Sequence, residues 1–183
     1  MSPQVNDTGR ARPRLVLWVG RRHSGKTTAA GELVRLARRR GLAVAGVLAP
    51  AIRQAGELVG FEVVDIATGR RVELARLDRG GDLRAGRFAF SKEALAFGTS
   101  ALLAGRDAAL VVVDEFGPLE LAGEGWRGAV DVLLGSSARV VMLVVREELA
   151  PAVEALYADF RPVMVPAAGS DAAERVLEML AAP

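Results

Sequence analysis

Uninterrupted runs of hydrophobic residues alternate along the chain with segments in which hydrophobic residues recur at helical spacing. Short apolar runs of this kind are typical of parallel strands that helices cover on both faces. They predict strands at Leu15–Val19, Leu42–Leu48, Ala109–Val113, Val140–Val145 and Arg161–Val165. Helical spacing predicts a helix that starts near Gly25 and ends before Gly41, and further helices at Ser91–Gly105, Trp126–Leu134, Pro151–Ala158 and Ala172–Leu180. We therefore predict a three-layer α/β fold with a mostly parallel sheet.

One segment interrupts this alternation. Leu58–Ile66 and Val72–Leu77 have the pattern of strands, and the connection Ala67–Gly69 between them is short enough to force an antiparallel pair. The sequence therefore predicts a small antiparallel hairpin insert. The following segment, Asp78–Arg87, is rich in glycine and charge and is expected to be a mobile loop.

The length of 183 residues and the hydrophobic share of 51% are typical of one globular domain with a hydrophobic core. We expect this domain to span residues 13–183, after a polar, disordered tail at residues 1–12. The chain has no cysteine, which excludes disulfides, thiolate metal sites and cysteine nucleophiles. It also lacks a signal-peptide pattern and any apolar run near the ~18 residues that span a bilayer, so a cytoplasmic protein without membrane contact is predicted.

Charge adds little to this picture. The formal net charge is +2, and arginines are spread among acidic residues instead of gathering in one segment. A nucleic-acid-binding protein usually carries its basic residues as one patch or stripe. No nucleic-acid partner is therefore expected.

The segment Gly20–Thr27 fits the pattern G-x-x-x-x-G-K-[ST] and lies between the first predicted strand and the first predicted helix. Glycines in such a loop let backbone N–H groups converge on phosphate oxygens, and the positive end of the following helix points at the same anion. We expect Lys26 to reach the β- and γ-phosphates and the Thr27 hydroxyl to bind Mg²⁺. The predicted nucleotide-binding residues are Gly20, Arg21, Arg22, His23, Ser24, Gly25, Lys26, Thr27 and Thr28.

Two acidic residues, Asp114 and Glu115, follow directly after a buried strand. The carboxyl ends of strands are where doubly wound sheets bind their ligands. Asp114 can hold Mg²⁺ there, while Glu115 stays free to accept a proton from an attacking water. Paired acids at this position therefore suit the hydrolysis of a nucleoside triphosphate.

Two arginines are further candidates. Arg146 ends the strand Val140–Val145 and is predicted to lie on the same sheet edge, where it would sense the γ-phosphate as a catalytic residue. Arg53 lies in the loop expected before the hairpin insert and is a candidate for a supporting role in trans. Several strand–helix units separate Lys26 from Asp114, so we expect their strands to be neighbours in the sheet although they are not consecutive in the chain.

Two longer segments carry a resemblance to a known family. Val59–Gly69 is similar to the glycine-phenylalanine hairpin, and Val113–Leu121 is similar to the extended Walker B segment, of the thermophile-type or cancer-related nucleoside-triphosphatases. The resemblance runs in order from about Leu15 to Arg146 and implies a RecA-like P-loop core. It also implies slow Mg²⁺-dependent hydrolysis of ATP, GTP or other nucleoside triphosphates, and carries over as site residues Lys26, Thr27, Asp114, Glu115 and, in a supporting role, Glu120.

The leading hypothesis is therefore an Mg²⁺-dependent nucleoside-triphosphatase that cleaves the γ-phosphate of ATP or GTP. A nucleotide-dependent adaptor, such as the GTP-binding partner proteins of molybdenum-cofactor assembly, is one alternative. A small-molecule kinase with Asp78–Arg87 as a lid is another. The sequence leaves open the base preference, a protein partner and the oligomeric state.

Overall fold

The structure is a computed structural model that describes residues 12–77 and 83–181. In chain order its strands and helices are β1 (Arg14–Gly20), α1 (Lys26–Arg39), β2 (Val44–Leu48), β3 (Ala51–Gln54), β4 (Glu57–Asp65), β5 (Arg71–Arg76), β6 (Arg84–Ala85), β7 (Phe88–Phe90), α2 (Lys92–Ala104), β8 (Leu110–Val113), α3 (Pro118–Leu121), α4 (Arg127–Leu134), β9 (Val140–Arg146), α5 (Ala150–Leu156), β10 (Val163–Pro166) and α6 (Ala172–Ala181). Every strand and helix predicted from the hydrophobic pattern is present, with bounds shifted by a few residues.

All the strands belong to one sheet, in the order β10-β1-β9-β8-β2-β4-β5-β7-β6, with β3 paired to β4 off this path. The five strands from β10 to β2 pair in parallel. From β4 onward the pairing is antiparallel. The sheet therefore has a parallel core and an antiparallel extension, as the sequence predicted.

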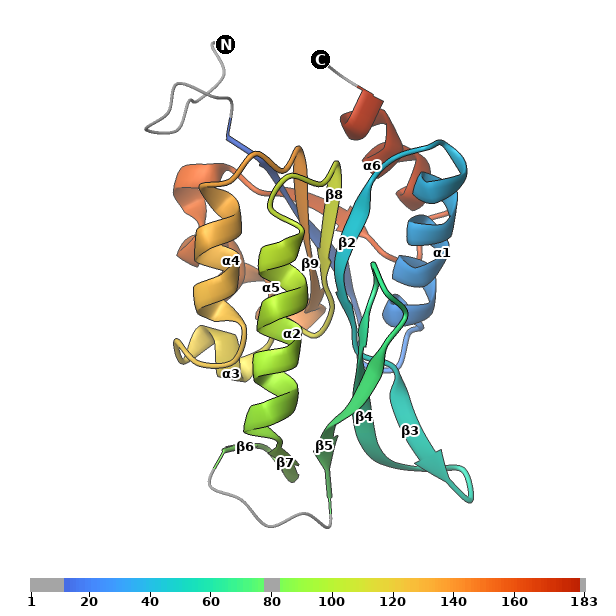
Figure 1. The fold of residues 1–183 in the computed structure, drawn as a ribbon, viewed down its shortest axis with the longest axis vertical. Helices are drawn as coiled ribbons and strands as arrows, with labels where there is room; N and C mark the ends of the chain where they lie inside the picture. The colour runs from blue at the N-terminus through green and yellow to red at the C-terminus, as the bar shows by residue number, and fades with distance from the viewer. Residues whose placement is uncertain (1–11, 78–82, 182–183) are drawn as a thin grey trace.

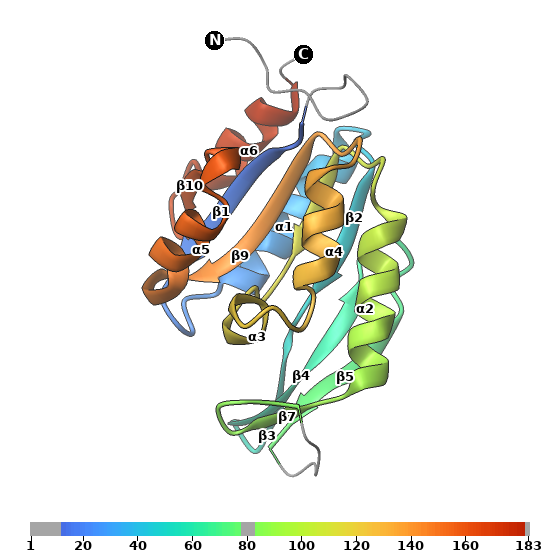
Figure 2. The same cartoon turned by 90° about the vertical axis from the view of Figure 1, so that its left-hand side faces the viewer.

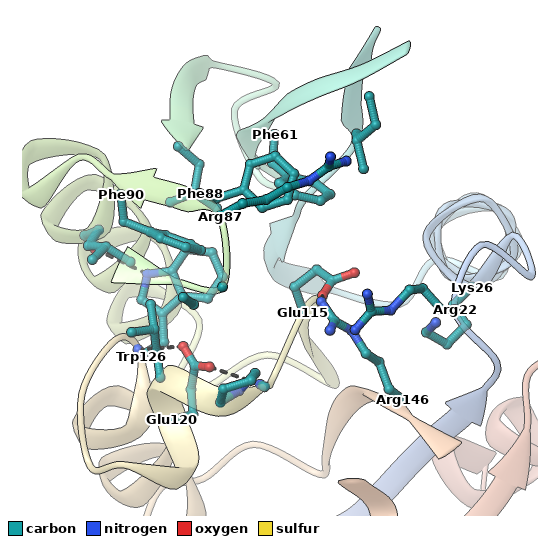
Figure 3. Close-up of a pocket in the computed structure, with 18 of the residues that line it drawn as sticks. Arg22, Lys26, Phe61, Arg87, Phe88, Phe90, Glu115, Glu120, Trp126 and Arg146 are labelled. Atoms are coloured by element: carbon teal, nitrogen blue, oxygen red, sulfur yellow. Dashed lines mark hydrogen bonds and ion pairs between the residues drawn. The ribbon is translucent and has the colours of Figure 1, made fainter. Parts of the chain in front are cut away.

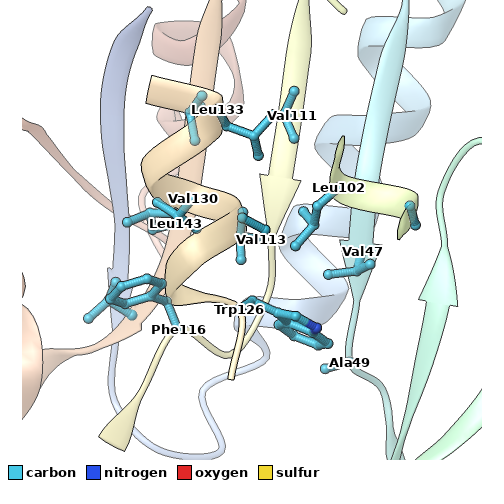
Figure 4. Close-up of a cluster of buried hydrophobic side chains, with 14 of the residues drawn as sticks. Val47, Ala49, Leu102, Val111, Val113, Phe116, Trp126, Val130, Leu133 and Leu143 are labelled. Carbon is cyan, nitrogen blue, oxygen red and sulfur yellow. The ribbon is translucent and has the colours of Figure 1, made fainter. Parts of the chain in front are cut away.

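Helices cover both faces of this sheet (Figures 1 and 2). The helices α1 and α6 lie on one face, and α2, α3, α4 and α5 lie on the other. Two separate clusters of buried hydrophobic residues fill the two spaces between sheet and helices. Figure 4 shows part of the larger cluster, which includes the rings of Trp126 and Phe116. The predicted three-layer α/β arrangement is confirmed.

Local signals in the sequence set several element ends. The Ser91 hydroxyl accepts a hydrogen bond from the Ala94 N–H at 3.1 Å and so caps the start of α2. Gly41 follows α1 with a φ of 72°, the left-handed conformation that glycine adopts without strain. Within the part of the chain that is described, no helix is both long enough and apolar enough to cross a membrane.

Three sequence expectations are wrong. Arg53 lies on strand β3 and not in a loop, because Ala51–Gln54 pairs antiparallel with β4. The described end of the predicted mobile loop forms a small hairpin of β6 and β7, because Arg84 and Ala85 pair with strand β7. The strands that carry the phosphate loop and the acidic pair, β1 and β8, are not neighbours, because β9 pairs with both of them.

Two expectations lie wholly or partly outside the described residues. Residues 1–11 of the predicted tail and residues 78–82 of the predicted loop are not among the described residues. The last tail residue, Arg12, is described, and its guanidinium lies 5.4 Å from the centre of the Phe160 ring.

Candidate active site

The connection from β1 to α1 forms a tight loop over the end of the sheet. His23 and Gly25 have φ angles of 61° and 80°, so the backbone turns sharply just before the helix. A Cβ atom at Gly20 would lie 2.9 Å from the Ser24 hydroxyl oxygen and 3.0 Å from Cγ of Lys26, closer than side chains tolerate. A tight glycine-containing loop that leads into a helix is the arrangement in which backbone N–H groups and the positive end of the helix bind phosphate.

Lys26 is the first residue of α1, and its side chain is buried although it carries a charge. Its ammonium group donates a hydrogen bond to the Arg21 carbonyl oxygen at 2.9 Å. The ammonium is therefore held across the mouth of the loop. A phosphate oxygen could replace that carbonyl as acceptor, with the advantage of a full negative charge.

Asp114 follows β8 and is fully buried. Its carboxylate accepts hydrogen bonds from the Ala49 N–H at 2.9 Å, from the Glu115 N–H at 3.1 Å and from the Thr27 side chain. Burial, reinforced by the negative charge of Glu115, raises the pKa of Asp114 to about 6, and these three donors oppose the rise. The structure thus brings the predicted metal ligands Thr27 and Asp114 into contact.

Glu115 and Arg146 form an ion pair beside Asp114, with 3.3 Å between the Glu115 carboxylate and the Arg146 guanidinium. The pairing arises from the sheet, because β9 lies next to β8 and both strands end at this edge. Register on the other side places Arg146 opposite Gly20, the first residue of the phosphate loop. The predicted catalytic residues Lys26, Glu115 and Arg146 therefore share one edge of the sheet.

Glu120 is buried and lines the cavity described below, and each of its carboxylate oxygens is held by a backbone N–H group. Its carboxylate accepts hydrogen bonds from the Gly117 N–H at 2.9 Å and from the Trp126 N–H at 3.1 Å. Burial raises the pKa of Glu120, and these N–H donors limit the rise. Glu120 therefore fixes the path of the chain after Glu115.

A cavity of about 350 Å³ opens from the phosphate loop toward the antiparallel extension of the sheet. In Figure 3, Arg22, Lys26 and Arg146 lie on one side of this cavity, and Phe88, Phe90 and Trp126 lie on the other. Glu115 lies between the two groups. The cavity thus has a charged half at the phosphate loop and a ring-lined half beneath β4, β5 and β7.

The remaining predicted residues lie at the rim or farther away. Arg21 and Arg22 are exposed and pair with Glu147 and Glu148 at 3.3 Å and 4.0 Å. His23, Ser24 and Thr28 are also exposed on the loop and the first turn of α1. Arg53 is exposed on β3, does not line the cavity, and donates a hydrogen bond to the Gly56 carbonyl at 2.9 Å. The structure does not bring Arg53 to the other candidates.

Sequence reasoning missed the ring-lined half of the cavity. Phe61 lies on β4, Trp126 at the start of α4, and Arg87, Phe88 and Phe90 in and just before β7, so only the folded chain brings these three places together. A signal was present in the short segment 87–90, which reads Arg-Phe-Ala-Phe and places two rings on one face of a strand.

The oxygen ligands suit a hard divalent cation. The Thr27 hydroxyl and the Asp114 carboxylate are in hydrogen-bond contact, and Mg²⁺ prefers such oxygen ligands. Among the described residues, no three acidic, histidine or cysteine side chains gather into a metal-binding cage. Mg²⁺ usually takes one or two protein oxygens and completes its octahedron with phosphate oxygens and water.

Comparison with known proteins shows that this chain is similar to nucleoside-triphosphatases. The family profile described as NTPase matches residues 16–167. A protein of Methanothermobacter thermautotrophicus called nucleoside-triphosphatase THEP1 is 37% identical over 138 residues, which cover 73% of this chain and 78% of that protein. The protein of the same name from Thermofilum pendens is 37% identical over 134 residues, which cover 72% and 74% of the two chains.

Two solved structures share the fold. A human cancer-related nucleoside triphosphatase superposes with a TM-score of 0.70 at 20% identity, over 92% of this chain and 96% of that one. THEP1 from Aquifex aeolicus superposes with a TM-score of 0.62 at 16% identity, over 91% and 98% of the two chains.

Proposed function

Because this chain belongs to the nucleoside-triphosphatase family matched above, we propose that it hydrolyses the γ-phosphate of nucleoside triphosphates at the edge that carries Lys26, Asp114 and Glu115. ATP and GTP are the substrates proposed, with Mg²⁺ as cofactor. The observation that carries this proposal is the contact of the phosphate-loop residue Thr27 with Asp114, next to the Glu115–Arg146 ion pair. Phosphate, metal and general-base groups therefore occur together.

The order of the strands gives the substrate a direction. Strand β10 lies on one side of β1, whereas β9 and β8 lie on the other. The γ-phosphate has to reach Glu115 and Arg146, which end or follow these two strands. The triphosphate therefore runs along the phosphate loop with its γ end toward β8, and the nucleoside extends toward β10.

Hydrolysis needs a nucleophile in line with the bond that breaks. A water beside Glu115 gives its proton to the carboxylate while its oxygen bonds to the γ-phosphorus, and the bond from that phosphorus to the β-phosphate oxygen breaks. Lys26 and the loop N–H groups stabilise charge on the β- and γ-phosphates, and Arg146 stabilises charge on the transferred group. Mg²⁺ held by Thr27 and Asp114 would neutralise further charge on the β- and γ-phosphate oxygens.

The comparisons favour hydrolysis over the two alternatives. The matched family and the relatives reported above are named for nucleoside-triphosphatase activity. An adaptor would bind nucleotide tightly but turn it over only with a partner. A kinase would place the phosphoryl group on an organic acceptor instead of on water. Measuring free phosphate released by the isolated protein separates all three.

The proposal is tested by measuring phosphate release from Mg²⁺-ATP and Mg²⁺-GTP by the wild type and by Glu115→Gln. The amide keeps the shape of the side chain but cannot accept the proton, so turnover should fall by at least ~100-fold while nucleotide binding persists. Glu124→Gln, an exposed acid after α3, is the matched control and should behave as the wild type. An unchanged rate for Glu115→Gln would contradict the proposed role of Glu115. An unchanged rate after chelation of Mg²⁺ would contradict the proposal that Mg²⁺ is the cofactor.

A further inference from the structure

The ring-lined half of the cavity has no task in the hydrolysis described above. Phe61 of β4 and Phe88 of β7 meet edge to face with their centres 5.1 Å apart. Trp126 lines the same space, and its indole N–H is already bonded to the Leu95 carbonyl oxygen at 3.1 Å. The three rings offer apolar surfaces and no polar atom that needs a water partner. The Glu120 carboxylate also lines this space, and each of its oxygens already accepts a backbone N–H hydrogen bond, from Gly117 and from Trp126.

A positively charged side chain, Arg87, lies at the rim of the ring-lined half of the cavity. The Arg87 guanidinium lies 5.5 Å from the centre of the Phe88 ring, and the residue is exposed in the turn between β6 and β7. Arginine combined with aromatic rings recognises planar molecules that carry a negative charge, because the guanidinium pairs with the anion and the rings stack on its plane.

The ring-lined half lies beyond Glu115 as seen from Lys26 (Figure 3). The nucleophile has to approach the γ-phosphorus from the side opposite the leaving β-phosphate. With the γ end directed toward Glu115, that side is the ring-lined half. A molecule bound there therefore occupies the place from which water attacks.

The size of the cavity also points to an organic occupant. One water takes about 30 Å³ of liquid, whereas the whole cavity has a volume of about 350 Å³. Volumes from about 300 Å³ upward are usual for pockets that bind small organic molecules, and such pockets are mostly apolar with a few polar groups. A site for water alone would need neither the rings nor this volume.

We propose that the space lined by Phe61, Phe88, Phe90 and Trp126, with Arg87 at its rim, is a second binding site that takes a planar organic anion next to the γ-phosphate. The placement beside the γ-phosphate rests on the proposed function. The anion pairs with Arg87, its ring system packs against the aromatic side chains, and its inner end displaces the water beside Glu115. Occupied, this site lowers phosphate release without lowering the affinity for nucleotide.

The two tryptophans provide a site-specific test. Trp126 lines the cavity, whereas Trp18 belongs to the hydrophobic cluster on the opposite face of the sheet. The probe is 2-naphthoate, a planar two-ring acid, titrated to millimolar concentration into ¹⁵N-labelled protein saturated with a nonhydrolysable ATP analogue and Mg²⁺. The indole N–H resonance of Trp126 should shift and saturate while that of Trp18 stays in place.

Variants and turnover complete this experiment. Arg87→Ala should weaken naphthoate binding about fivefold, the loss of one cation contact of ~1 kcal/mol. Arg84→Ala, an exposed arginine of the same hairpin that does not line the cavity, should bind as the wild type. Phosphate release from Mg²⁺-ATP should fall in parallel with the Trp126 shift, with an unchanged KM for ATP.

Several results would overturn this inference. Absence of a Trp126 shift, equal shifts of both indoles, or displacement of naphthoate by the nucleotide analogue would each contradict a separate site. A Trp126 shift without any change in turnover would contradict the place assigned to the occupant. If the wild type releases no phosphate at all, the proposed function fails, yet the resonance titration still decides whether the second site exists.

Discussion

Glu115, the proposed general base, has an unfavourable backbone conformation. Its φ of 64° is in the left-handed region, which costs a non-glycine residue about 1 kcal/mol or more. The conformation is held from both sides, because Asp114 accepts the Glu115 N–H and the next residue, Phe116, donates to the Val144 carbonyl at 3.0 Å. This bend turns the carboxylate toward the cavity and toward Arg146.

The strain at Glu115 predicts opposite changes in stability and activity. Glu115→Gly removes the strain and the repulsion with Asp114, so the free energy of unfolding should rise by about 1 kcal/mol while turnover is lost. Ala55→Gly, at an exposed turn with a φ of 47°, should gain similar stability and keep full activity. Urea denaturation and phosphate release measure the two effects. Loss of stability in Glu115→Gly would show that the ion pair with Arg146 outweighs the backbone strain.

Arg146 is expected to act mainly on the transition state. Arg146→Ala should lower turnover by about 10²- to 10³-fold and change nucleotide affinity much less, because the charge that it stabilises develops during phosphoryl transfer. Arg106→Ala, an exposed arginine after α2, serves as the control. Equal falls in affinity and turnover would instead assign Arg146 to ground-state binding.

The residues that follow a local motif could be predicted from the sequence, and the others could not. Lys26, Thr27 and Asp114 occupy positions that the phosphate-loop pattern and the strand end define. The aromatic residues of the cavity, such as Phe61 and Trp126, approach one another only through tertiary contacts between α2, α4 and the antiparallel extension. Their chemistry was visible in the sequence, but their proximity was not.

The packing of α2 against the start of α4 holds the cavity wall in place. Gly98 lies in the middle of α2 directly beneath the Trp126 ring, and a Cβ atom there would lie 2.6 Å from its indole nitrogen. The same indole donates to the Leu95 carbonyl of α2. Glycine is therefore needed here for the close approach of the two elements.

This contact predicts the effect of adding one methyl group. Gly98→Ala should destabilise the protein by about 1–3 kcal/mol through overpacking against Trp126. Gly128→Ala in α4, where a Cβ would meet nothing within 4 Å, should instead stabilise it by up to about 1 kcal/mol through helix propensity. Chemical denaturation distinguishes the two, and a neutral Gly98→Ala would mean that α2 can shift away from α4 without cost.

Tyr157, at the end of α5, is tied to α4, because its hydroxyl donates to Asp131 at 2.9 Å. Burial, helped by this hydrogen bond, raises the pKa of Tyr157 above its ordinary value of 10.0. The folded protein thus keeps the phenol neutral after the unfolded chain has ionised, so its contribution to stability is complete below about pH 10 and falls as the pH rises further.

The pH dependence can be checked with Tyr157→Phe. The variant should be less stable than the wild type by about 1 kcal/mol at pH 7, because it lacks the hydrogen bond. The difference should shrink at about pH 11, where only the wild type loses stability by this linkage. Urea denaturation at both pH values measures it, and a difference that widens with pH would contradict the raised pKa.

At the level of elements, apolar runs predicted every strand of the parallel core, and helical spacing predicted each helix of eight residues or more. The shorter helix α5 was also predicted, with its bounds shifted by one or two residues. Short elements escaped prediction. Strand β3 has exposed or half-exposed residues throughout and exists because β4 offers a pairing edge. Helix α3 has four residues and is capped by the Glu120 side chain, a tertiary arrangement without a hydrophobic period.

The whole molecule depends on the strand order, which the sequence did not reveal. Insertion of β9 between β1 and β8 places Arg146 opposite Gly20 and beside Glu115. The antiparallel extension then continues the sheet past β2 and forms the far wall of the cavity. Local patterns set which segments become strands, whereas the order of parallel strands depends on long-range packing of the helices between them.

The central claim is that the loop at Gly20–Thr27 holds a triphosphate for hydrolysis at the adjacent acids. The most direct test is the rate of phosphate release from Mg²⁺-ATP and Mg²⁺-GTP by the wild type and by Lys26→Ala, with the fold of both confirmed by circular dichroism. We predict steady release by the wild type and a loss of at least ~100-fold in the variant, since the ammonium that stabilises the β- and γ-phosphates is gone. Equal rates for the two proteins would contradict the account.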